Sequence, residues 1–571
     1  MGVSPRIQRR SLADAPILHD TNIAAVLRRV YAGRGVQSAS EVDLRLAHLL
    51  PPTLGDLDRA CEHLLRWREA QAHITVVGDF DADGATGTAV AVRGLRLLGF
   101  QRVDYRVPNR FLHGYGLSPA VVDALDPAPN VILTVDNGVA ALAGVTAAKS
   151  RGIEVLITDH HLPAETLPEA VAIVNPNLHG DTFPSKALAG VGVVFYLLIA
   201  LRARLRELGS PQGQVDLSTL LDLVAIGTVA DLVALDANNR RLVRAGLQRI
   251  REERAHAGVL ALFRAAGRDP RRATGADLGF AIGPRINAAG RLEDMALGIE
   301  CLLCDDALRA DAFAQRLNNI NHERRDLQQA MVDQAEALLE ARLPSFDAAH
   351  VPAGLVLHDA DWHSGVIGLV ASKLKERLHR PIIACAPAED GSGEWKGSGR
   401  SIPGFHLRDC LVALDTRHPG LLKRYGGHAM AAGLSIDGER LPELVNAFEQ
   451  IASEWLSPEL LQATIWTDGP LRADEISLSQ AEALRAGGPW GQAFPEPLFD
   501  NEFELERWSV MAERHLRLNL RLLPERHPVE AIFFNAYRGE APQKTFRAAY
   551  QLEIDEWRGE PRLRLMLRHW E

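Results

Sequence analysis

Between residues 55 and 175, short apolar runs rich in β-branched residues alternate with segments of helix length, and this alternation constrains the fold most. The runs are HITVVG, VILTVD, IEVLIT and VAIVNP, and alanine- and leucine-rich segments such as TAVAVRGLRLLG and ALAGVTAAKSRG lie between them. Strands buried on both faces read as continuous apolar runs, and strands that alternate with helices form βαβ units. The pattern therefore predicts an α/β domain built on a parallel sheet.

The rest of the chain divides into further regions, as a length of 571 residues requires. No glycine or proline occurs between Gly298 and Pro344, which predicts one or two helices, the later one long and bridging two domains. A second α/β region begins near VPAGLVLHD, and runs such as HLRLNLRLL and FRAAYQLEI predict a small C-terminal β-barrel or sandwich. The first 45 residues are mixed in composition and helical at most. The predicted boundaries are 1–45 (N-terminal segment), 46–310 (first α/β domain), 311–345 (connecting helix), 346–455 (second α/β domain) and 456–571 (β-domain).

Composition argues against several classes of protein. The chain is 47% hydrophobic and 24% charged, and it has no uninterrupted apolar run of about 18 residues, so a membrane span is not expected. The basic residues of MGVSPRIQRRSLADAP are not followed by an apolar stretch, so a secretory leader is not expected either. Five scattered cysteines suit a reducing cytoplasm, and Cys301 and Cys304 are predicted to be core thiols. The net charge of −10 does not exclude a nucleic acid ligand, because bound cations restore positive charge around acidic ligands.

Acidic residues stand where three of the predicted strands end. After HITVV, VILTV and IEVLIT come, in turn, Asp79, Asp81 and Asp83, then Asp136, then Asp159, His160 and His161. Side chains just beyond the carboxyl ends of parallel strands converge on one crevice, so these groups are expected to share a pocket. Carboxylates this crowded cannot all stay ionised without cations, and mixed carboxylate and imidazole ligands favour Mn²⁺ or Mg²⁺. Two such ions about 3.5–4 Å apart suit the hydrolysis of phosphate esters.

Four motifs, DFDADG, TVDNG, TDHH and GTVADLVAL, resemble in this order the motifs of the DHH phosphoesterase superfamily. HSGVIGLVASKL, GSGRS and GGHAMAAG resemble the DHH-associated domain that follows in that superfamily. VPNRFLHGYGLS, PRINAAGR and GPWGQAFPEPLF resemble its RecJ branch, the bacterial single-strand DNA exonucleases. The resemblance runs in unbroken order from about residue 40 to the end of the sequence. It implies a parallel-sheet DHH domain, a long connecting helix, a DHH-associated domain and a C-terminal barrel of the OB-fold type.

The same resemblance implies two metal sites with a shared ligand. The ligands it implies for one ion are Asp83, Asp136, His160 and Asp231, and those for the other are Asp79, Asp81 and again Asp136. His161 is expected to face the scissile phosphate as a catalytic residue, and Asp159 to orient the imidazoles. The small-molecule members of the superfamily carry a histidine upstream of the aspartates, where this chain has VVG.

Further residues of these motifs are expected to bind the substrate. Arginines suit bidentate phosphate contacts, turns of glycine and serine expose backbone N–H groups to anions, and a tyrosine can stack on a base. The residues predicted on these grounds are Arg110, Tyr115, Arg285, Asn287, Arg291, Ser398, Arg400, Ser401 and His428. Core packing is an equal alternative for Tyr115.

The resemblance implies an exonuclease specific for single-stranded DNA. Such an enzyme works 5′→3′ with two Mn²⁺ or Mg²⁺ ions and releases 5′-mononucleotides, in DNA repair and recombination. Its expected partner is single-stranded DNA, with single-strand binding protein and a helicase as further candidates. Two alternatives stay open: a DHH phosphodiesterase or pyrophosphatase for small substrates, and a non-catalytic DNA-binding scaffold.

Overall fold

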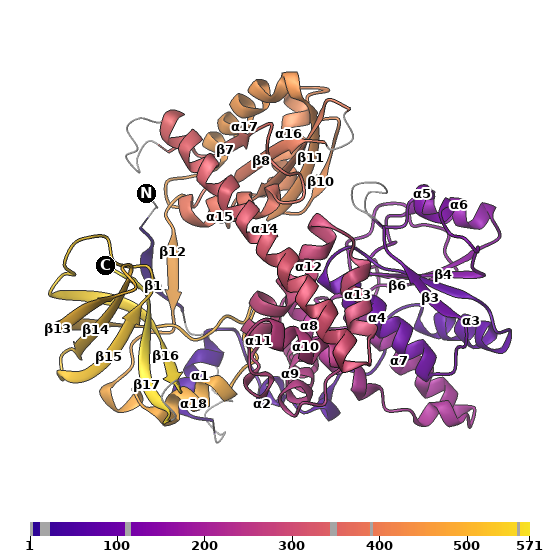
Figure 1. Cartoon of the computed structure of the whole chain (residues 1–571), viewed down its shortest axis with the longest axis horizontal. Helices are drawn as coiled ribbons and strands as arrows, with labels where there is room; N and C mark the ends of the chain where they lie inside the picture. The colour runs from indigo at the N-terminus through magenta and orange to yellow at the C-terminus, as the bar shows by residue number, and fades with distance from the viewer. Residues whose placement is uncertain (1–3, 12–22, 109–115, 343–350, 389–391, 557–559) are drawn as a thin grey trace. The chain divides into compact units, whose positions relative to one another are not determined.

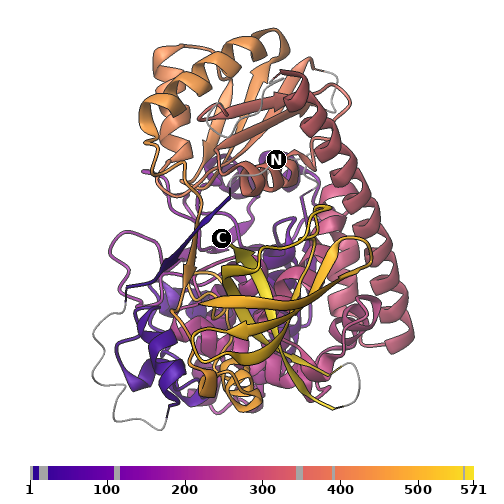
Figure 2. The same ribbon diagram turned by 90° about the vertical axis from the view of Figure 1, so that its left-hand side faces the viewer.

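The computed structural model describes residues 4–11, 23–108, 116–342, 351–388, 392–556 and 560–571 (Figures 1 and 2). The chain divides into two compact units. The parallel-sheet unit comprises Ser38–Glu323 and Gly488–Glu496. The barrel unit comprises Met1–Gln37, Arg324–Gly487 and Pro497–Glu571. Among the described residues, no helix is both long enough and apolar enough to cross a bilayer.

The first unit is built on a five-stranded sheet in which every strand is parallel to its neighbours, in the order β3-β2-β4-β5-β6. The strands are β2 (Ile74–Val77), β3 (Val103–Arg106), β4 (Val131–Val135), β5 (Glu154–Thr158) and β6 (Ala172–Val174). Strands β2 and β4 are buried along their whole length, as their apolar runs predict. Strand β3 was not among the predicted runs, because its sequence VDYR is half polar and it lies at the sheet edge.

Helices follow the strands in this unit and continue beyond the sheet. They are α2 (Ala39–Val42), α3 (Leu57–Glu69), α4 (Ala82–Leu97), α5 (Pro119–Asp123), α6 (Leu142–Ser150), α7 (Gly190–Glu207), α8 (Leu221–Ala230), α9 (Ala237–Arg251), α10 (Ala257–Ala265), α11 (Gly275–Asp277), α12 (Gly283–Leu292) and α13 (Ala296–Leu303). Helix α8 is apolar on all sides and packs between α4, α7 and α9. The α4–α7 contact is tight, because a Cβ on Gly94 would lie 2.2 Å from Leu198 Cδ1.

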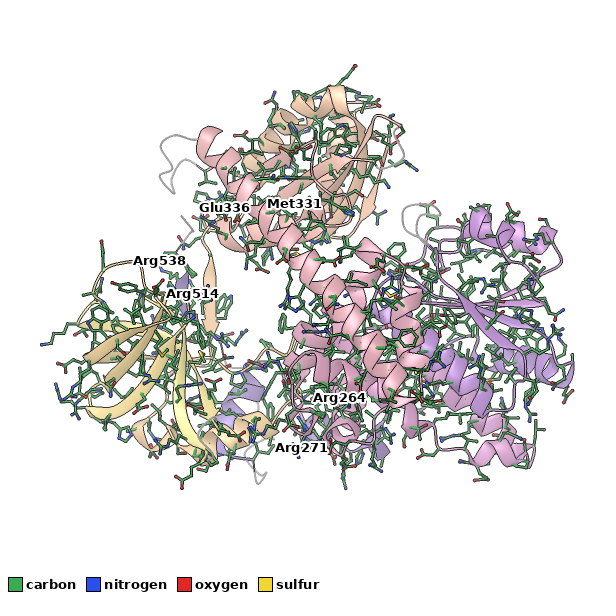
Figure 3. All side chains as sticks on the ribbon, in the orientation of Figure 1. Arg264, Arg271, Met331, Glu336, Arg514 and Arg538 are labelled. Atoms are coloured by element: carbon green, nitrogen blue, oxygen red, sulfur yellow. The ribbon has the colours of Figure 1, made fainter. Side chains whose placement is uncertain are left out.

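A long helix, α14 (Ala307–Arg342), follows α13, in agreement with the prediction of one or two helices, the later one long, in the stretch without glycine or proline. Its residues up to Glu323 belong to the parallel-sheet unit and those from Arg324 onward to the barrel unit. In the latter part, Met331 is buried and Glu336 forms an ion pair with Arg377 (Figure 3).

The barrel unit contains a second five-stranded sheet, in the order β10-β11-β9-β8-β7. Its strands are β7 (Leu355–His358), β8 (Ile382–Pro387), β9 (Glu394–Arg400), β10 (Arg424–Gly427) and β11 (Ala431–Asp437), and its helices are α15 (Ile367–Leu378), α16 (Leu407–Arg417) and α17 (Leu441–Trp455). Leu411 and Leu414 of α16 and Phe448 of α17 pack with the sheet residues Val356 and Ile383 in one core. This arrangement confirms the predicted second α/β region.

The C-terminal strands close into a barrel in the order β13-β14-β15-β17-β16, with β15 parallel to β17 and the other pairs antiparallel. They are β13 (Phe499–Met511), β14 (His515–Leu522), β15 (His527–Phe533), β16 (Thr545–Asp555) and β17 (Arg562–Trp570), and α18 (Leu478–Ala486) precedes them. On β14 the leucines at even positions from Leu516 to Leu522 are buried, while Arg517 and Asn519 are exposed. The alternation predicted from HLRLNLRLL is therefore confirmed.

The prediction that the N-terminal segment is helical at most was wrong for one stretch. Besides α1 (Ala25–Ala32), the segment contains β1 (Arg6–Arg9), which pairs in parallel with β12 (Thr464–Thr467). In β1 (RIQR) only Ile7 is apolar, and only Ile7 is buried. Four residues with a single apolar side chain are too few to predict a strand. The strand forms because distant residues supply its partner.

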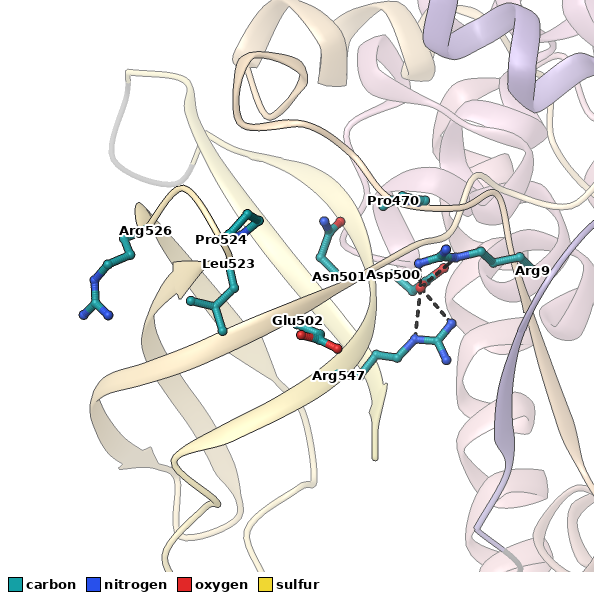
Figure 4. A pocket seen from close by; sticks show the side chains of 9 residues that line it. All are labelled: Arg9, Pro470, Asp500, Asn501, Glu502, Leu523, Pro524, Arg526 and Arg547. Atoms are coloured by element: carbon teal, nitrogen blue, oxygen red, sulfur yellow. Dashed lines mark hydrogen bonds and ion pairs between the residues drawn. The ribbon is translucent and has the colours of Figure 1, made fainter.

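An ion-pair cluster ties this strand to the barrel. Asp500 of β13 is fully buried, and its Oδ2 lies 2.9 Å from Arg9 Nη2 and 2.8 Å from Arg547 Nη2 (Figure 4). Burial alone would raise the pKa of Asp500, but hydrogen bonds from Arg9, Thr467 and Arg547 hold it below its usual value. Arg9, Asp500 and Arg547 are among the residues that line a pocket of about 830 Å³ (Figure 4).

Candidate metal centre

The acidic and imidazole side chains predicted to converge stand where parallel strands end. Asp79 follows β2, Asp136 directly follows β4, and Asp159 directly follows β5. Asp81 is the N-cap of α4, and its Oδ1 accepts a hydrogen bond from the Gly84 N–H at 2.9 Å. The capped turn brings Asp83 into the first turn of the helix, where its side chain is fully buried.

Three overlapping groups of side chains could each hold a metal ion, since in each group one ligand atom per residue lies within 4.8 Å of the others. The groups are Asp83, His160 and Asp231; Asp79, Asp81 and Asp136; and Asp136, His160 and His161. His160 Nε2 also lies 3.1 Å from Asp136 Oδ1 and 3.5 Å from Asp231 Oδ2. Asp136 thus stands between two ligand sets, and all six predicted ligands meet in one place.

The N-terminus of α7 holds Asp83. The Gly190 N–H donates to Asp83 Oδ2 at 2.6 Å, and the Val191 N–H donates to Oδ1 at 3.0 Å. These donors favour the carboxylate, as the positive end of a helix does. Burial and the charge of Asp81 nevertheless raise the pKa of Asp83 to about 7. A bound cation would therefore favour the ionised form of this carboxyl group at neutral pH.

The ionised forms of Asp136 and Asp231 are disfavoured in the same way as that of Asp83. Burial, followed by the charges of neighbouring aspartates, raises the pKa of each well above its usual value. Asp136 also has a φ of 63°, in the left-handed region, which is uncommon for a residue other than glycine. A Cβ on Gly190 would lie only 2.5 Å from Asp136 Cβ, so the close approach of α7 requires glycine there.

The two histidines differ in electrostatic environment. Burial and then the charge of His161 lower the pKa of His160 to about 4, so its imidazole is neutral at physiological pH. Its Nε2 is buried and makes no hydrogen bond within the part of the chain that the structure describes. A neutral imidazole nitrogen aimed at two carboxylates is a ready metal ligand. The donor set of carboxylates and one or two imidazoles therefore fits a divalent ion such as Mn²⁺ or Mg²⁺.

Asp159 organises the turn that carries the histidines. Its Oδ1 accepts the N–H of His160 at 2.7 Å and lies 2.8 Å from His161 Nδ1, and its Oδ2 accepts the Val139 N–H at 2.8 Å. These hydrogen bonds outweigh burial and keep the pKa of Asp159 below its usual value. Burial would lower the pKa of His161, but the hydrogen bond to Asp159 and its charge raise it overall. The pair favours an imidazolium that points towards the carboxylate cluster.

Several residues that support the centre were not among those predicted from the sequence. The side-chain amides of Asn177 and Asn175 donate to the carbonyl oxygens of His160 and His161, at 2.6 and 2.9 Å. Gly190 gave no signal, because its requirement comes from contact with Asp136, which is distant in sequence. The motif NPN after β6 was the available hint for the two asparagines.

The predicted substrate-binding residues are spread over both units. In the first, Arg285 is buried and donates to Asn318 Oδ1 and the Ala281 carbonyl, while Arg291 lies half-buried in the last turn of α12. Asn287 Oδ1 accepts the Ala82 N–H at 2.8 Å, so this side chain reaches the backbone between two predicted metal ligands. Arg110 and Tyr115 lie outside the described residues.

The remaining predicted substrate residues lie on or next to β9 and β11 of the barrel unit. Arg400 contacts Ser398 Oγ at 3.1 Å and the Gly399 carbonyl at 2.8 Å, with no carboxylate partner among the described residues, and burial lowers its pKa. Ser401 is buried and donates to the Phe405 carbonyl, whereas the His428 side chain is exposed.

All five cysteines are free and buried, which confirms the core role predicted for Cys301 and Cys304.

Comparison with known proteins agrees with this fold and site. Three family models match the chain: the DHH family N-terminal domain at residues 73–228, the DHHA1 domain at 351–454 and the RecJ OB domain at 467–569. A parallel sheet with aspartates and a DHH triplet at its carboxyl edge, followed by these domains, defines a phosphoesterase of the DHH class, a hydrolase of ester bonds.

Whole-chain relatives define the class further. A protein named single-stranded-DNA-specific exonuclease RecJ from Dickeya dadantii is 48% identical over 100% of this chain and 99% of its own length. Its namesake from Salmonella typhimurium is 47% identical over 98% of both chains. The crystal structure of RecJ from Thermus thermophilus in complex with Mn²⁺ superposes with a TM-score of 0.82 at 31% identity, covering 99% of this chain and 79% of that one. The chain belongs to the RecJ family.

Proposed function

We propose that the chain is an exonuclease that degrades single-stranded DNA by hydrolysing phosphodiester bonds with two Mn²⁺ or Mg²⁺ ions. The observation that carries the proposal is the meeting of three ligand groups, with Asp136 between them, at the carboxyl edge of the sheet. The two divalent ions supply Lewis-acid stabilisation and lower the pKa of water, as phosphodiester hydrolysis requires. The names of the whole-chain relatives supply the substrate class.

The chain's own residues have separate roles in this proposal. Asp83, Asp136, His160 and Asp231 would hold one ion, and Asp79, Asp81 and Asp136 the other. The grouping of Asp83 with His160 and Asp231, that of Asp136 with Asp79 and Asp81, and the 3.1 Å between His160 Nε2 and Asp136 Oδ1 support this division. His161, whose pKa Asp159 raises, presents positive charge to the non-bridging oxygens of the scissile phosphate. Asp159 orients the imidazole and does not touch the phosphate.

The residues that contact the substrate and the direction of degradation complete the proposal. Arg400 is a half-buried cation with neutral neighbours, which suits a phosphate contact, and Ser398, Ser401 and His428 lie close to it in sequence or across the sheet. We assign Arg110, Tyr115, Arg285, Asn287 and Arg291 to the same substrate path. The 5′→3′ direction and the release of 5′-mononucleotides follow from membership of the family.

The domain boundaries and the cellular setting belong to the same proposal. The three family matches fall within the predicted domains 46–310, 346–455 and 456–571, which supports that division. Free, buried cysteines suit a reducing cytoplasm. Single-strand binding protein and a helicase are the proposed protein partners, in DNA repair and recombination.

A hydrolase for small phosphoesters is the second candidate. The observation against it is the closed C-terminal barrel, because a barrel of this kind with an exposed basic strand serves to grip single strands. A non-catalytic scaffold is the third candidate, and the complete set of ligands opposes it.

The test compares end-labelled, 5′-phosphorylated single strands with matched duplexes, in Mn²⁺ and in EDTA. We expect hydrolysis of the single strand in Mn²⁺ only, and a loss of at least about 10³-fold in Asp136→Ala, because removal of a group that stabilises the transition state costs that much. Asp305→Ala, which removes an exposed carboxylate paired with Arg93, is the matched control and should retain the activity. Hydrolysis of duplexes at the same rate as single strands, or hydrolysis of small phosphoesters and not of DNA, would favour the second candidate. DNA binding without hydrolysis would favour the scaffold.

A further inference from the structure

Nine residues that come just before the C-terminal barrel in the sequence belong to the parallel-sheet unit. The segment Gly488–Glu496 lies on the chain between α18 and β13, yet it packs with the parallel-sheet unit. Its sequence is GPWGQAFPE, part of a motif to which the proposed function gives no role. We call it the 488–496 segment.

The segment is a tight turn anchored by aromatic rings. Gly491 and Phe494 exchange two backbone hydrogen bonds, at 2.9 and 3.1 Å, and this turn brings the rings of Trp490 and Phe494 into a stack with centroids 5.2 Å apart. The guanidinium of Arg240, near the start of α9, lies 3.9 Å from the centroid of the Phe494 ring. Both partners are nearly inaccessible, with exposed fractions of 2% for Arg240 and 4% for Phe494. A buried cation over a ring face is attracted by the ring's electron density, so this contact holds the segment against α9.

The same turn contacts the loop that carries a predicted metal ligand. Asp231 ends α8, and the next residues run to Ala237, where α9 begins. In this loop the Leu235 N–H donates to the Gln492 carbonyl at 2.9 Å. A Cβ on Gly491 would lie 2.7 Å from Leu235 Cδ1, so the 488–496 segment and this loop are in close contact. Leu232, next to Asp231, has a φ of 61°, a conformation that the surrounding contacts must hold.

We propose that the 488–496 segment positions Asp231, and that it thereby sets the affinity of the metal site formed by Asp83, His160 and Asp231. The loop is fixed at one end by helix α8 and at the other by the start of α9, where Asn239 donates to the Ala234 carbonyl and Ser185 to Asp236. The segment adds the hydrogen bond at Leu235 and the contact of Phe494 with Arg240. Loss of these added contacts loosens the loop and increases the ordering entropy that is lost when the ion binds. The inference rests on the proposed metal site, and it makes Trp490, Phe494 and Arg240 positioning residues.

The experiment titrates Mn²⁺ into the metal-free full-length protein without DNA, by calorimetry. Phe494→Leu keeps the bulk of the side chain but removes the ring face and the stack with Trp490. We expect one of the two binding steps to weaken about tenfold or more, the range typical of residues that orient metal ligands, and the other step, at Asp79, Asp81 and Asp136, to be unchanged. Phe494→Tyr retains the ring and should bind as the wild type does.

Trp455→Ala is the matched control, because it removes a partly exposed aromatic ring packed on Phe405 in the other unit. Equal Mn²⁺ affinities in wild type and Phe494→Leu, with only a lower melting temperature, would overturn the inference and leave a purely structural contact. Weakening of both steps alike would also overturn it. If the wild type itself binds no Mn²⁺, the proposed function fails instead.

Discussion

The carboxyl groups of Asp83 and Asp136, which are buried, and of Asp231, which is half-buried, lie together at the predicted metal centre, and the pKa of each is raised. Their raised pKa values mean that the folded, metal-free chain binds more protons than the unfolded chain between about pH 4 and 7. These groups therefore make the metal-free fold less stable as the pH rises through that window. Divalent ions reverse the effect, because they bind the ionised form.

We accordingly expect the rise in melting temperature caused by saturating Mg²⁺ to be larger at pH 8 than at pH 5.5. The apparent metal affinity should fall about tenfold per pH unit below pH 7 for each proton that the ion displaces. Thermal unfolding with and without Mg²⁺ at the two pH values tests this. A metal-induced shift that is independent of pH would contradict it.

His161 offers a second test on a single residue. Asp159 raises the pKa of His161 through a 2.8 Å hydrogen bond and its charge, so we expect Asp159→Asn to lower that pKa and to reduce hydrolysis about 10- to 100-fold. Titration of the metal-free protein followed by NMR of the histidine rings measures the shift. Asp222→Asn, which changes the partner of His256 at 2.9 Å, should leave the pKa of His161 unchanged.

Helix α7 is the element on which the centre depends most closely. Gly190→Ala would place a Cβ 2.5 Å from Asp136 Cβ and 2.8 Å from its Oδ1, and the helix could avoid this clash only by withdrawing the N–H that Asp83 accepts. We expect hydrolysis to fall at least about 100-fold, with a loss of about 1–3 kcal/mol in the free energy of unfolding.

Gly192→Ala is the control on the same helix. Its Cβ would lie 3.1 Å from Leu188 Cδ2, the flexible end of a side chain, so metal affinity and activity should stay within about twofold of the wild type. Equal effects of the two substitutions, measured by metal titration and by chemical denaturation, would show that α7 does not shape the site.

At the scale of the whole molecule, we expect the barrel to contribute positive charge to the binding of single-stranded DNA. Arg517 is exposed on β14 and has no ion pair within the described ranges. We expect Arg517→Ala to weaken binding of long single strands in EDTA, and to reduce the slope of log K against log salt concentration by about 0.7, the value for one lost phosphate contact. Binding isotherms at several salt concentrations measure this slope. Arg204→Ala, an exposed arginine of α7 paired with Asp58, should leave the slope unchanged.

Much of the architecture could be predicted from the sequence because local patterns carry it. The four apolar runs became β2, β4, β5 and β6, the stretch without glycine or proline became α13 and α14, and the alternating C-terminal runs became strands of the barrel. The elements that were missed, β1 and β3, have short and largely polar sequences, and each pairs with a strand that defines it. Such a strand cannot be predicted from its own four residues, because its formation depends on a partner strand elsewhere in the sequence.

The amino-acid sequence by itself determined which side chains are candidates for the metal centre: strand ends and charge point to Asp83, Asp136 and His160, and the resemblance of GTVADLVAL to a DHH motif adds Asp231. Only the tertiary structure decided how they are held: the α7 N-terminus on Asp83, Gly190 against Asp136, and the 488–496 segment beside the loop of Asp231. The physical reason is that ligand identity is a local property of residue type. Ligand geometry, burial and pKa arise from contacts between residues that are far apart along the chain.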